Sequence, residues 1–302
     1  MFAPSDPLPV SEISQTRLFF RVLRHRVTST PARVPVVHWR HRRLRQSDVL
    51  LASYPRSGST WLRFVLYEIL TGQSSSFDRV NGALRGLTDC RHGARLLPNQ
   101  GRFIGTHEPY YPAYHRAIYL VRDVRNVALS EFAFEKNLGI ARSTFDLYLD
   151  EMLFGRKRHG SWQHHVESWL DSPLAASGDL FFLQYEKLRQ DSVNAFLELL
   201  DFLKVRRSRE VVERAITNNT VEQMREKEDR LYRQQNYSSV PRRPLKAVRP
   251  GGRFVRNGEV GGWRERLSTE QLHLIEVHTS RVLARLGYPV ESLAPAEASS
   301  TA

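Results

Sequence analysis

Short apolar segments alternate with amphipathic helical patterns along the chain, and this alternation limits the fold more than any other feature. The segments typical of buried strands are 49–54, 102–107, 117–123 and 179–186, and the helical patterns after them include 61–72, 124–137 and 187–205. Short strands that alternate with helices favour a parallel sheet covered by helices on both faces. We therefore predict an α/β fold.

The two ends of the chain and one internal segment have a different composition. Residues 1–47 are rich in arginine and are interpreted as a solvated basic extension, with a nucleic-acid-binding arm as the alternative. After a helical pattern at 210–220, the segment 226–263 is too polar and too rich in Gly and Pro to form core, so we predict a long surface loop. A last helix is predicted over 268–288, capped by the Ser268 hydroxyl, before a flexible tail.

Net charge and cysteine content limit the ligands and the sites that the chain can have. The 45 Lys and Arg against 32 Asp and Glu leave a formal charge of +13, which attracts phosphate, sulfate, nucleic acid or anionic lipid without choosing among them. Cys90 is the only cysteine, which excludes an intrachain disulfide and a zinc site of the multi-cysteine kind. The N-terminal residues have the pattern of neither a secretory signal nor a spanning helix, so we expect a cytoplasmic protein.

The stretch "SYPRSGSTWLR" connects the first predicted strand to its helix. A strand, a short loop and a helix N-terminus form an anion site, because unpaired amides and the helix dipole point at the loop. Gly58 allows close backbone approach, Arg56 adds a positive charge, and hydroxyls come from Ser57, Ser59 and Thr60. The pattern "GxxxxGK[ST]" is absent, which disfavours an ATP site. The alternative is a helix-capping turn with Arg56 on the surface.

A second strand-to-helix junction carries "RDVRNVALS". Arg122 ends the strand, Asp123 can cap the helix, and Ser130 lies two turns along it, so the segment predicts a second anion site. His107 ends a neighbouring predicted strand, where catalytic groups collect in sheets of this kind, and histidine accepts a proton near neutral pH. The other histidines, among them His165, are interpreted as structural.

Four segments in order resemble the motifs of one family, the sulfotransferases of the cytosolic type that depend on 3′-phosphoadenosine 5′-phosphosulfate (PAPS). "YPRSGSTW" resembles their 5′-phosphosulfate loop, "YPKSGTTW", and "RDVRNVALS" resembles their 3′-phosphate motif. "GTHEP" resembles the "KTHLP" segment that carries their catalytic histidine, and "RFVRNGEVGGW" resembles their C-terminal "RKGxxGDW". The resemblance runs from about residue 48 to residue 288.

The resemblance implies a P-loop-NTPase-like α/β fold in three layers, with a central parallel sheet flanked by helices. It implies transfer of the sulfuryl group of PAPS to a hydroxyl or amine of a small-molecule, saccharide or lipid acceptor, without a metal. His107 would be the general base, and Arg56 and Ser130 would act on the charge of the leaving phosphate. The cofactor-binding residues that it implies are Arg56, Ser57, Gly58, Ser59, Thr60, Trp61, Arg122, Ser130, Tyr185, Thr220, Arg256, Asn257 and Gly258.

The domain organisation follows from the same comparison. We predict a sulfotransferase domain over 48–290 with a lid near 225–262, between the N-terminal extension 1–47 and the tail 291–302.

The chain departs from the family's pattern at several positions. Arg56, Gly105 and Asn257 stand where the family has lysine. Gly262 replaces the aspartate of "GDW", and Val221 falls where an aromatic residue stacks on adenine. Arginine keeps the charge at position 56 but makes a poor proton donor, so its role there would be electrostatic.

Two other function classes stay open at this point. A nucleotide-dependent phosphotransferase on a related fold is disfavoured by the missing "GK[ST]". A nucleic-acid-binding protein would explain the charge but not two ordered anion motifs and a histidine.

Overall fold

The computed structural model describes Pro35, Trp39 and residues 41–137, 144–237, 253–256 and 258–291. Most of the predicted N-terminal extension, the tail after Glu291 and one predicted site residue, Asn257, lie outside the described residues.

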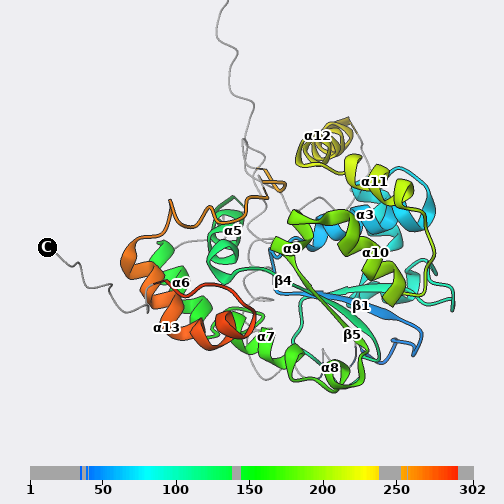
Figure 1. Cartoon of the computed structure of the whole chain (residues 1–302). Helices are drawn as coiled ribbons and strands as arrows, with labels where there is room; N and C mark the ends of the chain where they lie inside the picture. Colours follow the sequence, from blue (N-terminus) through cyan, green and yellow to red (C-terminus); the bar gives the residue numbers. More distant parts are fainter. Residues whose placement is uncertain are drawn as a thin grey trace, which may run out of the picture.

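A five-stranded parallel sheet forms the centre of the molecule (Figure 1). Its strands are β1 (Val49–Ser53), β2 (Arg85–Gly86), β3 (Phe103–Thr106), β4 (Ala117–Val121) and β5 (Leu180–Gln184). The order across the sheet is β2-β3-β1-β4-β5, so the chain goes from β1 to the edge strand β2, returns to β3 beside β1, and then crosses to β4 on the other side of β1. In sheets of this kind ligands bind at the carboxyl ends of the strands next to such a crossing.

Alternate residues of the buried strands face two separate hydrophobic cores. In β1, Val49 and Leu51 belong to one core, whereas Leu50 and Ala52 belong to the other. This alternation follows from the period of two residues in a strand, and it explains why strands buried on both faces read as continuous apolar runs. The predicted α/β fold with helices on both faces of a parallel sheet is confirmed.

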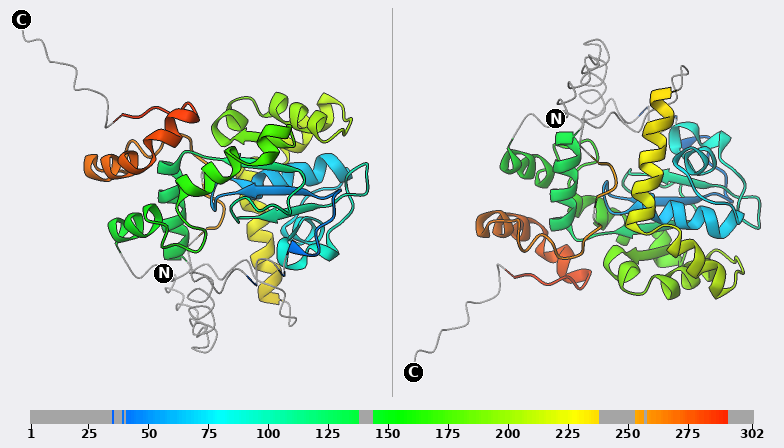
Figure 2. Two further views of the ribbon diagram at one scale, coloured as in Figure 1. Left: turned by 90° about the horizontal axis from the view of Figure 1, so that it is seen from below. Right: turned by 90° about the horizontal axis from the view of Figure 1, so that it is seen from above.

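The helices divide between the two cores (Figures 1 and 2). Helices with buried residues in the first core are α3 (Ser59–Thr71), α4 (Phe77–Ala83), α9 (Tyr185–Gln190), α10 (Ser192–Phe202), α11 (Arg209–Thr217) and α12 (Val221–Tyr237). Those in the second core are α5 (Val124–Asn137), α6 (Phe145–Leu153), α7 (Trp162–Leu170), α8 (Pro173–Ser177) and α13 (Thr269–Arg285), and a 3₁₀ turn, η1 (Leu87–His92), also contributes to it. Within the described chain, no helix is both long and apolar enough to span a bilayer.

Two buried arginines tie distant elements together. Arg102 is 2% exposed and donates from Nε to Asp48 Oδ1 at 2.9 Å, which joins the starts of β3 and β1. Arg125 is fully buried between Asp123, at 2.8 Å, and Glu276, at 2.7 Å, and so connects α5 with α13. Each charge is paired, as burial requires, because an isolated buried charge is costly.

Two predictions about the elements need correction, and one strand was missed. The helix predicted over 187–205 is two helices, because Asp191 interrupts it and its side chain accepts the amide of Asn194 at the start of α10. The loop predicted from residue 226 begins later, since α12 continues to Tyr237. The polar composition of α12 hid a narrow buried stripe that includes Glu228 as well as Leu231. The two-residue strand β2 is too short to leave a pattern in the sequence.

Candidate active site

The loop between β1 and α3 lies at the carboxyl end of the central strand. Two of its residues have left-handed backbones, Arg56 with φ 64° and Gly58 with φ 99°. Gly58 caps α3 without a side-chain hydrogen bond, so no described side chain caps the amides of its first turn. The Ser57 hydroxyl is buried and has no hydrogen-bond partner among the described residues. Amides and a hydroxyl left in this state form a site for an anion.

The ring of Tyr185, the first residue of α9, packs against this loop at Gly58. An ideal Cβ on Gly58 would lie 2.6 Å from Cδ2 and Cε2 of the Tyr185 ring, so only glycine fits there. The Tyr185 hydroxyl donates to the Gly258 carbonyl at 2.9 Å, and the Arg122 guanidinium lies 4.5 Å from the ring centroid. One side chain thus contacts the loop, a strand end and the C-terminal segment.

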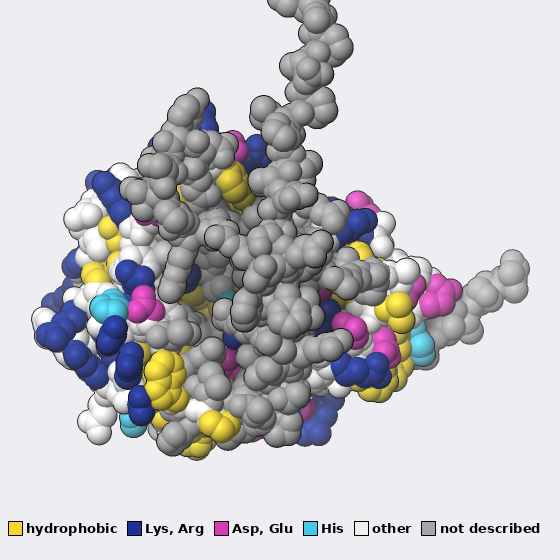
Figure 3. Space-filling view, turned by 180° about the vertical axis from the view of Figure 1, so that it is seen from behind, with side chains coloured by type: hydrophobic (Ala, Val, Ile, Leu, Met, Phe, Trp, Pro, Cys, Tyr) yellow, Lys and Arg dark blue, Asp and Glu magenta, His cyan; other side chains and the backbone are white. Residues whose placement is uncertain are grey.

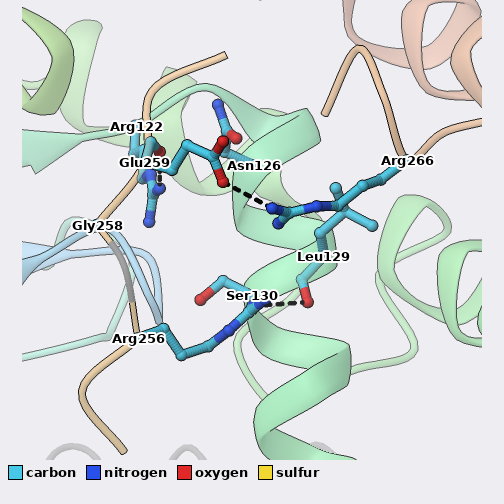
Figure 4. Close-up of a pocket in the computed structure, with 8 residues that line it drawn as sticks. All are labelled: Arg122, Asn126, Leu129, Ser130, Arg256, Gly258, Glu259 and Arg266. Atoms are coloured by element: carbon cyan, nitrogen blue, oxygen red, sulfur yellow. Dashed lines mark hydrogen bonds and ion pairs between the residues drawn. The ribbon is translucent and has the colours of Figure 1, made fainter. Parts of the chain in front are cut away.

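A small cavity joins the second predicted anion motif to the C-terminal segment (Figure 4). Its volume is about 30 Å³, and its lining residues are Arg122, Asn126, Leu129, Ser130, Arg256, Gly258, Glu259 and Arg266. Arg122 donates to the Glu259 carbonyl at 2.7 Å, and Arg256 donates to the Leu129 carbonyl at 3.3 Å. Burial, and then the neighbouring Arg266 and Arg122, lower the pKa of Arg256. Several arginines held this close favour a bound anion.

Arg56 is only partly exposed and packs against other segments of the chain, which argues against the simple capping turn. Its guanidinium lies between the rings of Phe134 and Phe254, 4.6 and 4.9 Å from their centroids. It donates to the Phe254 carbonyl at 3.1 Å and to Ser130 Oγ at 3.4 Å. Burial lowers the pKa of Arg56 to about 10, so the group keeps its charge at neutral pH. Arg56 therefore places a fixed cation beside Ser130.

His107 follows β3 directly, next to the end of β1. Its Nδ1 lies 2.8 Å from the Ser53 carbonyl oxygen. A carbonyl can only accept, so Nδ1 carries a proton, and in the neutral ring Nε2 is the proton acceptor. This tautomer suits a general base that uses Nε2.

The buried His165 makes a hydrogen bond to the backbone of His107. Its Nε2 donates to the His107 carbonyl at 3.2 Å, and its Nδ1 accepts from the Tyr119 hydroxyl at 2.9 Å. The interpretation of His165 as structural agrees with these contacts, which also position His107, the candidate catalytic residue. Nothing in the sequence indicated that the two histidines are in contact, because 58 residues separate them.

A larger cavity of about 400 Å³ opens beside Trp61. The indole Nε1 of Trp61 donates to the Asn219 carbonyl at 2.8 Å, and the Arg189 guanidinium lies 5.4 Å from the indole ring centroid. Thr220 and Val221 also line this cavity. The resemblance places both positions near the nucleotide. Val221 offers only an aliphatic surface, so Arg189, which sequence reasoning missed, is the second planar group at this site.

The structure accounts for one departure from the family's pattern. An ideal Cβ on Gly262 would lie 2.5 Å from Cδ of Glu259, so the Glu259 carboxylate occupies the space that an aspartate at 262 would need. At Gly105, in β3, an added Cβ would come no closer than 3.9 Å to the Arg85 carbonyl oxygen. Nothing in the structure explains the glycine at 105.

Most of the predicted site residues that the structure describes lie at or near the carboxyl ends of β1, β3, β4 and β5 and on the C-terminal segment beside them. Trp61, in α3, and Thr220, just before α12, line the larger cavity instead. Sequence reasoning missed Arg266, because arginine is too common in this chain for one position to be informative. It also missed Glu259, whose place at the site depends on its ion pair with Arg266. Figure 3 shows this abundance, with dark-blue Lys and Arg side chains on both flanks of the face and densest at the left of the view. Among the described residues, no group of three or more His, Cys, Asp or Glu could hold a metal ion.

Comparison with known proteins gives consistent matches. The family model for the sulfotransferase domain matches residues 46–287. Sulfotransferase 1E1 of Mus musculus is 25% identical over 239 residues, which span 73% of this chain and 78% of the relative. The amine sulfotransferase of Oryctolagus cuniculus is 25% identical over 245 residues, which span 76% of this chain and 78% of the relative.

Solved structures show the same fold. Retinol dehydratase in complex with retinol and PAP has a TM-score of 0.62 at 22% identity, over 80% of this chain and 82% of that chain. Mouse sulfotransferase SULT7A1 complexed with PAP has a TM-score of 0.57 at 20% identity, over 78% of this chain and 84% of that chain.

Proposed function

The chain belongs to the sulfotransferase family, and we propose that it transfers a sulfuryl group from PAPS to a hydroxyl or amine of its acceptor, with His107 as the general base. The observation that carries the proposal is the position of His107, held by the Ser53 carbonyl directly beside the anion-binding loop. The acceptor is a small molecule, a saccharide or a lipid. The predicted domain boundaries, the lid and the cytoplasmic location stay predictions.

The residues present fit the donor. The buried Ser57 hydroxyl and the Arg122 Nε have no hydrogen-bond partner among the described residues, as expected of groups that bind an anion. The 5′-phosphosulfate would bind the amides and hydroxyls of residues 56–60, and the 3′-phosphate would bind Arg122, Ser130 and the segment 256–258. The base would lie against Trp61 and Thr220 in the larger cavity.

The chemistry needs one proton acceptor and one region of positive charge. PAPS supplies the sulfuryl group, which forms a bond to the acceptor oxygen or nitrogen while its bond to the 5′-phosphate breaks and leaves PAP. His107 Nε2 takes the proton of the acceptor. Arg56 is too basic to donate a proton at neutral pH, so with Ser130 it stabilises the negative charge that develops on the phosphate oxygen.

His107→Ala tests the proposal. We expect this variant to bind PAP with wild-type affinity and to lose transfer by about 10²- to 10⁴-fold, the usual contribution of a general base. Calorimetry with PAP and transfer of label from PAPS to a panel of acceptors measure the two quantities. The exposed His115 provides the control, since His115→Ala should change neither. Near-normal turnover of His107→Ala would exclude His107 as the base.

A thermal-shift experiment separates the proposal from a phosphotransferase. PAP should raise the melting temperature of the wild-type chain, whereas ATP with Mg²⁺ should not, because the loop lacks the lysine of a Walker motif. Stabilisation by ATP with Mg²⁺ alone would favour the phosphotransferase, and retention on DNA without a nucleotide effect would favour a nucleic-acid-binding protein.

A further inference from the structure

An ion pair between Glu259 and Arg266 lies in the small cavity at the carboxyl end of β4. Arg266 donates to Glu259 Oε2 at 2.7 Å, and both residues line the cavity together with Arg122 and Arg256. Figure 4 shows the Glu259 side chain extending from the Arg122 side of the cavity to the Arg266 guanidinium. The Glu259 carboxylate thus pairs with Arg266 at the edge of a cavity that three arginines line, and the two side chains are partly exposed, at 38% and 40%.

The backbone holds Glu259 in this place. Its carbonyl accepts from Arg122 at 2.7 Å, and the neighbouring Gly258 carbonyl accepts from Tyr185 at 2.9 Å. Gly262 leaves the space in which the carboxylate lies, since a Cβ there would come within 2.5 Å of it. The backbone bonds thus fix where residue 259 lies, and Gly262 leaves room for its carboxylate.

Charge and volume indicate how a phosphate group would interact with the pair. The three arginines and one carboxylate leave an excess of positive charge, and a phosphate monoester brings about −1.5 to −2 at neutral pH. The cavity of about 30 Å³ has room for only one or two waters, so a phosphate group enters it only if a lining side chain moves. The Glu259 side chain is 38% exposed, so its carboxylate can swing toward solvent. Since a phosphate also repels this carboxylate, it would replace Glu259 as the partner of Arg266.

We propose that Arg266 binds the 3′-phosphate of the nucleotide directly, and that Glu259 holds its guanidinium at the site until the phosphate takes the place of the carboxylate. The inference rests on the proposed function, because it takes a nucleotide with a 3′-phosphate as the ligand. Arg266 then adds a cation in a chain whose sequence has asparagine at position 257, where the motif of the related sulfotransferases has lysine. The pair makes Arg266 a determinant of selectivity for 3′-phosphorylated nucleotides.

Arg266→Ala tests the role of Arg266, with PAP and AMP as probes in calorimetry. AMP lacks only the 3′-phosphate, so the variant should bind PAP about tenfold or more weakly and AMP within about twofold of the wild type. Arg266→Lys should recover part of the loss. Arg264→Ala is the matched control: Arg264 is on the same turn and pairs with Glu291, so its loss should change neither affinity. A folded Arg266→Ala variant with wild-type affinity for PAP would overturn the proposal.

Glu259→Gln tests the role of the carboxylate. The amide keeps the shape of the side chain but removes the charge that opposes a phosphate, so the affinity for PAP should rise by about threefold to tenfold without a change for AMP. An unchanged or lower affinity for PAP would show that Glu259 does not compete with the phosphate.

The wild-type chain separates a failure of this inference from a failure of the proposed function. If it bound AMP as tightly as PAP, the assignment of the 3′-phosphate site and with it the proposed function would fail. If it preferred PAP and Arg266→Ala kept the same preference, only the role of Arg266 would fail.

Discussion

Replacing Gly58 by alanine should disrupt the loop between β1 and α3 through two separable effects. Gly58 has φ 99°, and an added Cβ would lie 2.6 Å from the Tyr185 ring. The left-handed backbone costs about 1–2 kcal/mol with a side chain, and forcing a methyl group against a packed ring costs about 1–3 kcal/mol more. The free energy of unfolding should therefore fall by about 2–5 kcal/mol, which at about 2–4 °C per kcal/mol for a domain of this size lowers the melting temperature by roughly 4–20 °C.

Gly72→Ala provides the matched control at the other end of the same helix. Gly72 also has a left-handed backbone, with φ 70°, but nothing lies within 4 Å of an added Cβ. Its substitution should show the backbone effect alone, about 1–2 kcal/mol. The difference between the two variants in urea denaturation then measures the contact with the Tyr185 ring.

The loop substitution should also affect nucleotide binding. Moving Gly58 away from Tyr185 shifts the loop amides relative to Gly258, which Tyr185 holds at 2.9 Å. We expect at least a tenfold loss of PAP affinity in Gly58→Ala and none in Gly72→Ala. Equal destabilisation of the two variants, together with unchanged PAP affinity, would refute the reasoning.

Two buried carboxylates give further predictions. Burial, and then the Glu135 carboxylate, raise the pKa of Glu131 from 4.5 to about 7. Because the folded state binds this proton more tightly, the free energy of unfolding falls as the pH rises from about 4.5 to 7. In urea denaturation, Glu131→Gln should therefore raise the free energy of unfolding by up to about 3 kcal/mol at pH 8 but by little at pH 4. A gain independent of pH would contradict this. Glu228 accepts the amides of Phe254 and Val255 at 2.7 and 3.0 Å, so Glu228→Ala should release this segment from Arg56 and weaken PAP binding about tenfold in calorimetry. Unchanged affinity would show that the segment is held elsewhere.

Local patterns were sufficient for four of the five strands of the described sheet. The apolar runs of β1 and β4 are continuous because both faces of each strand are buried, and that burial can be read from neighbouring residues alone. The break at Asp191 and the helix α12 were missed. A capping side chain and a narrow buried stripe depend on contacts with other elements, which a local pattern does not contain.

Some residues of the candidate site could be predicted from the sequence, and others could not. Its loop, Arg122 and His107 were predicted because each follows a strand, and the carboxyl ends of parallel strands meet at one edge of a sheet. The roles of His165 and Glu259 could not be predicted. Both depend on single contacts between residues that are remote in sequence or packed against a particular glycine.

The sequence by itself determined the fold class, the family and the order of the anion-binding motifs, since strand and helix periodicity and short motifs are local properties of the chain. Only the tertiary structure decided which arginines share a site. Arg264 and Arg266 are two residues apart, yet one pairs with Glu291 and the other faces the cavity through Glu259. Electrostatic energy depends on distance and burial in space, and a chain rich in arginine does not encode either in the spacing of its charges.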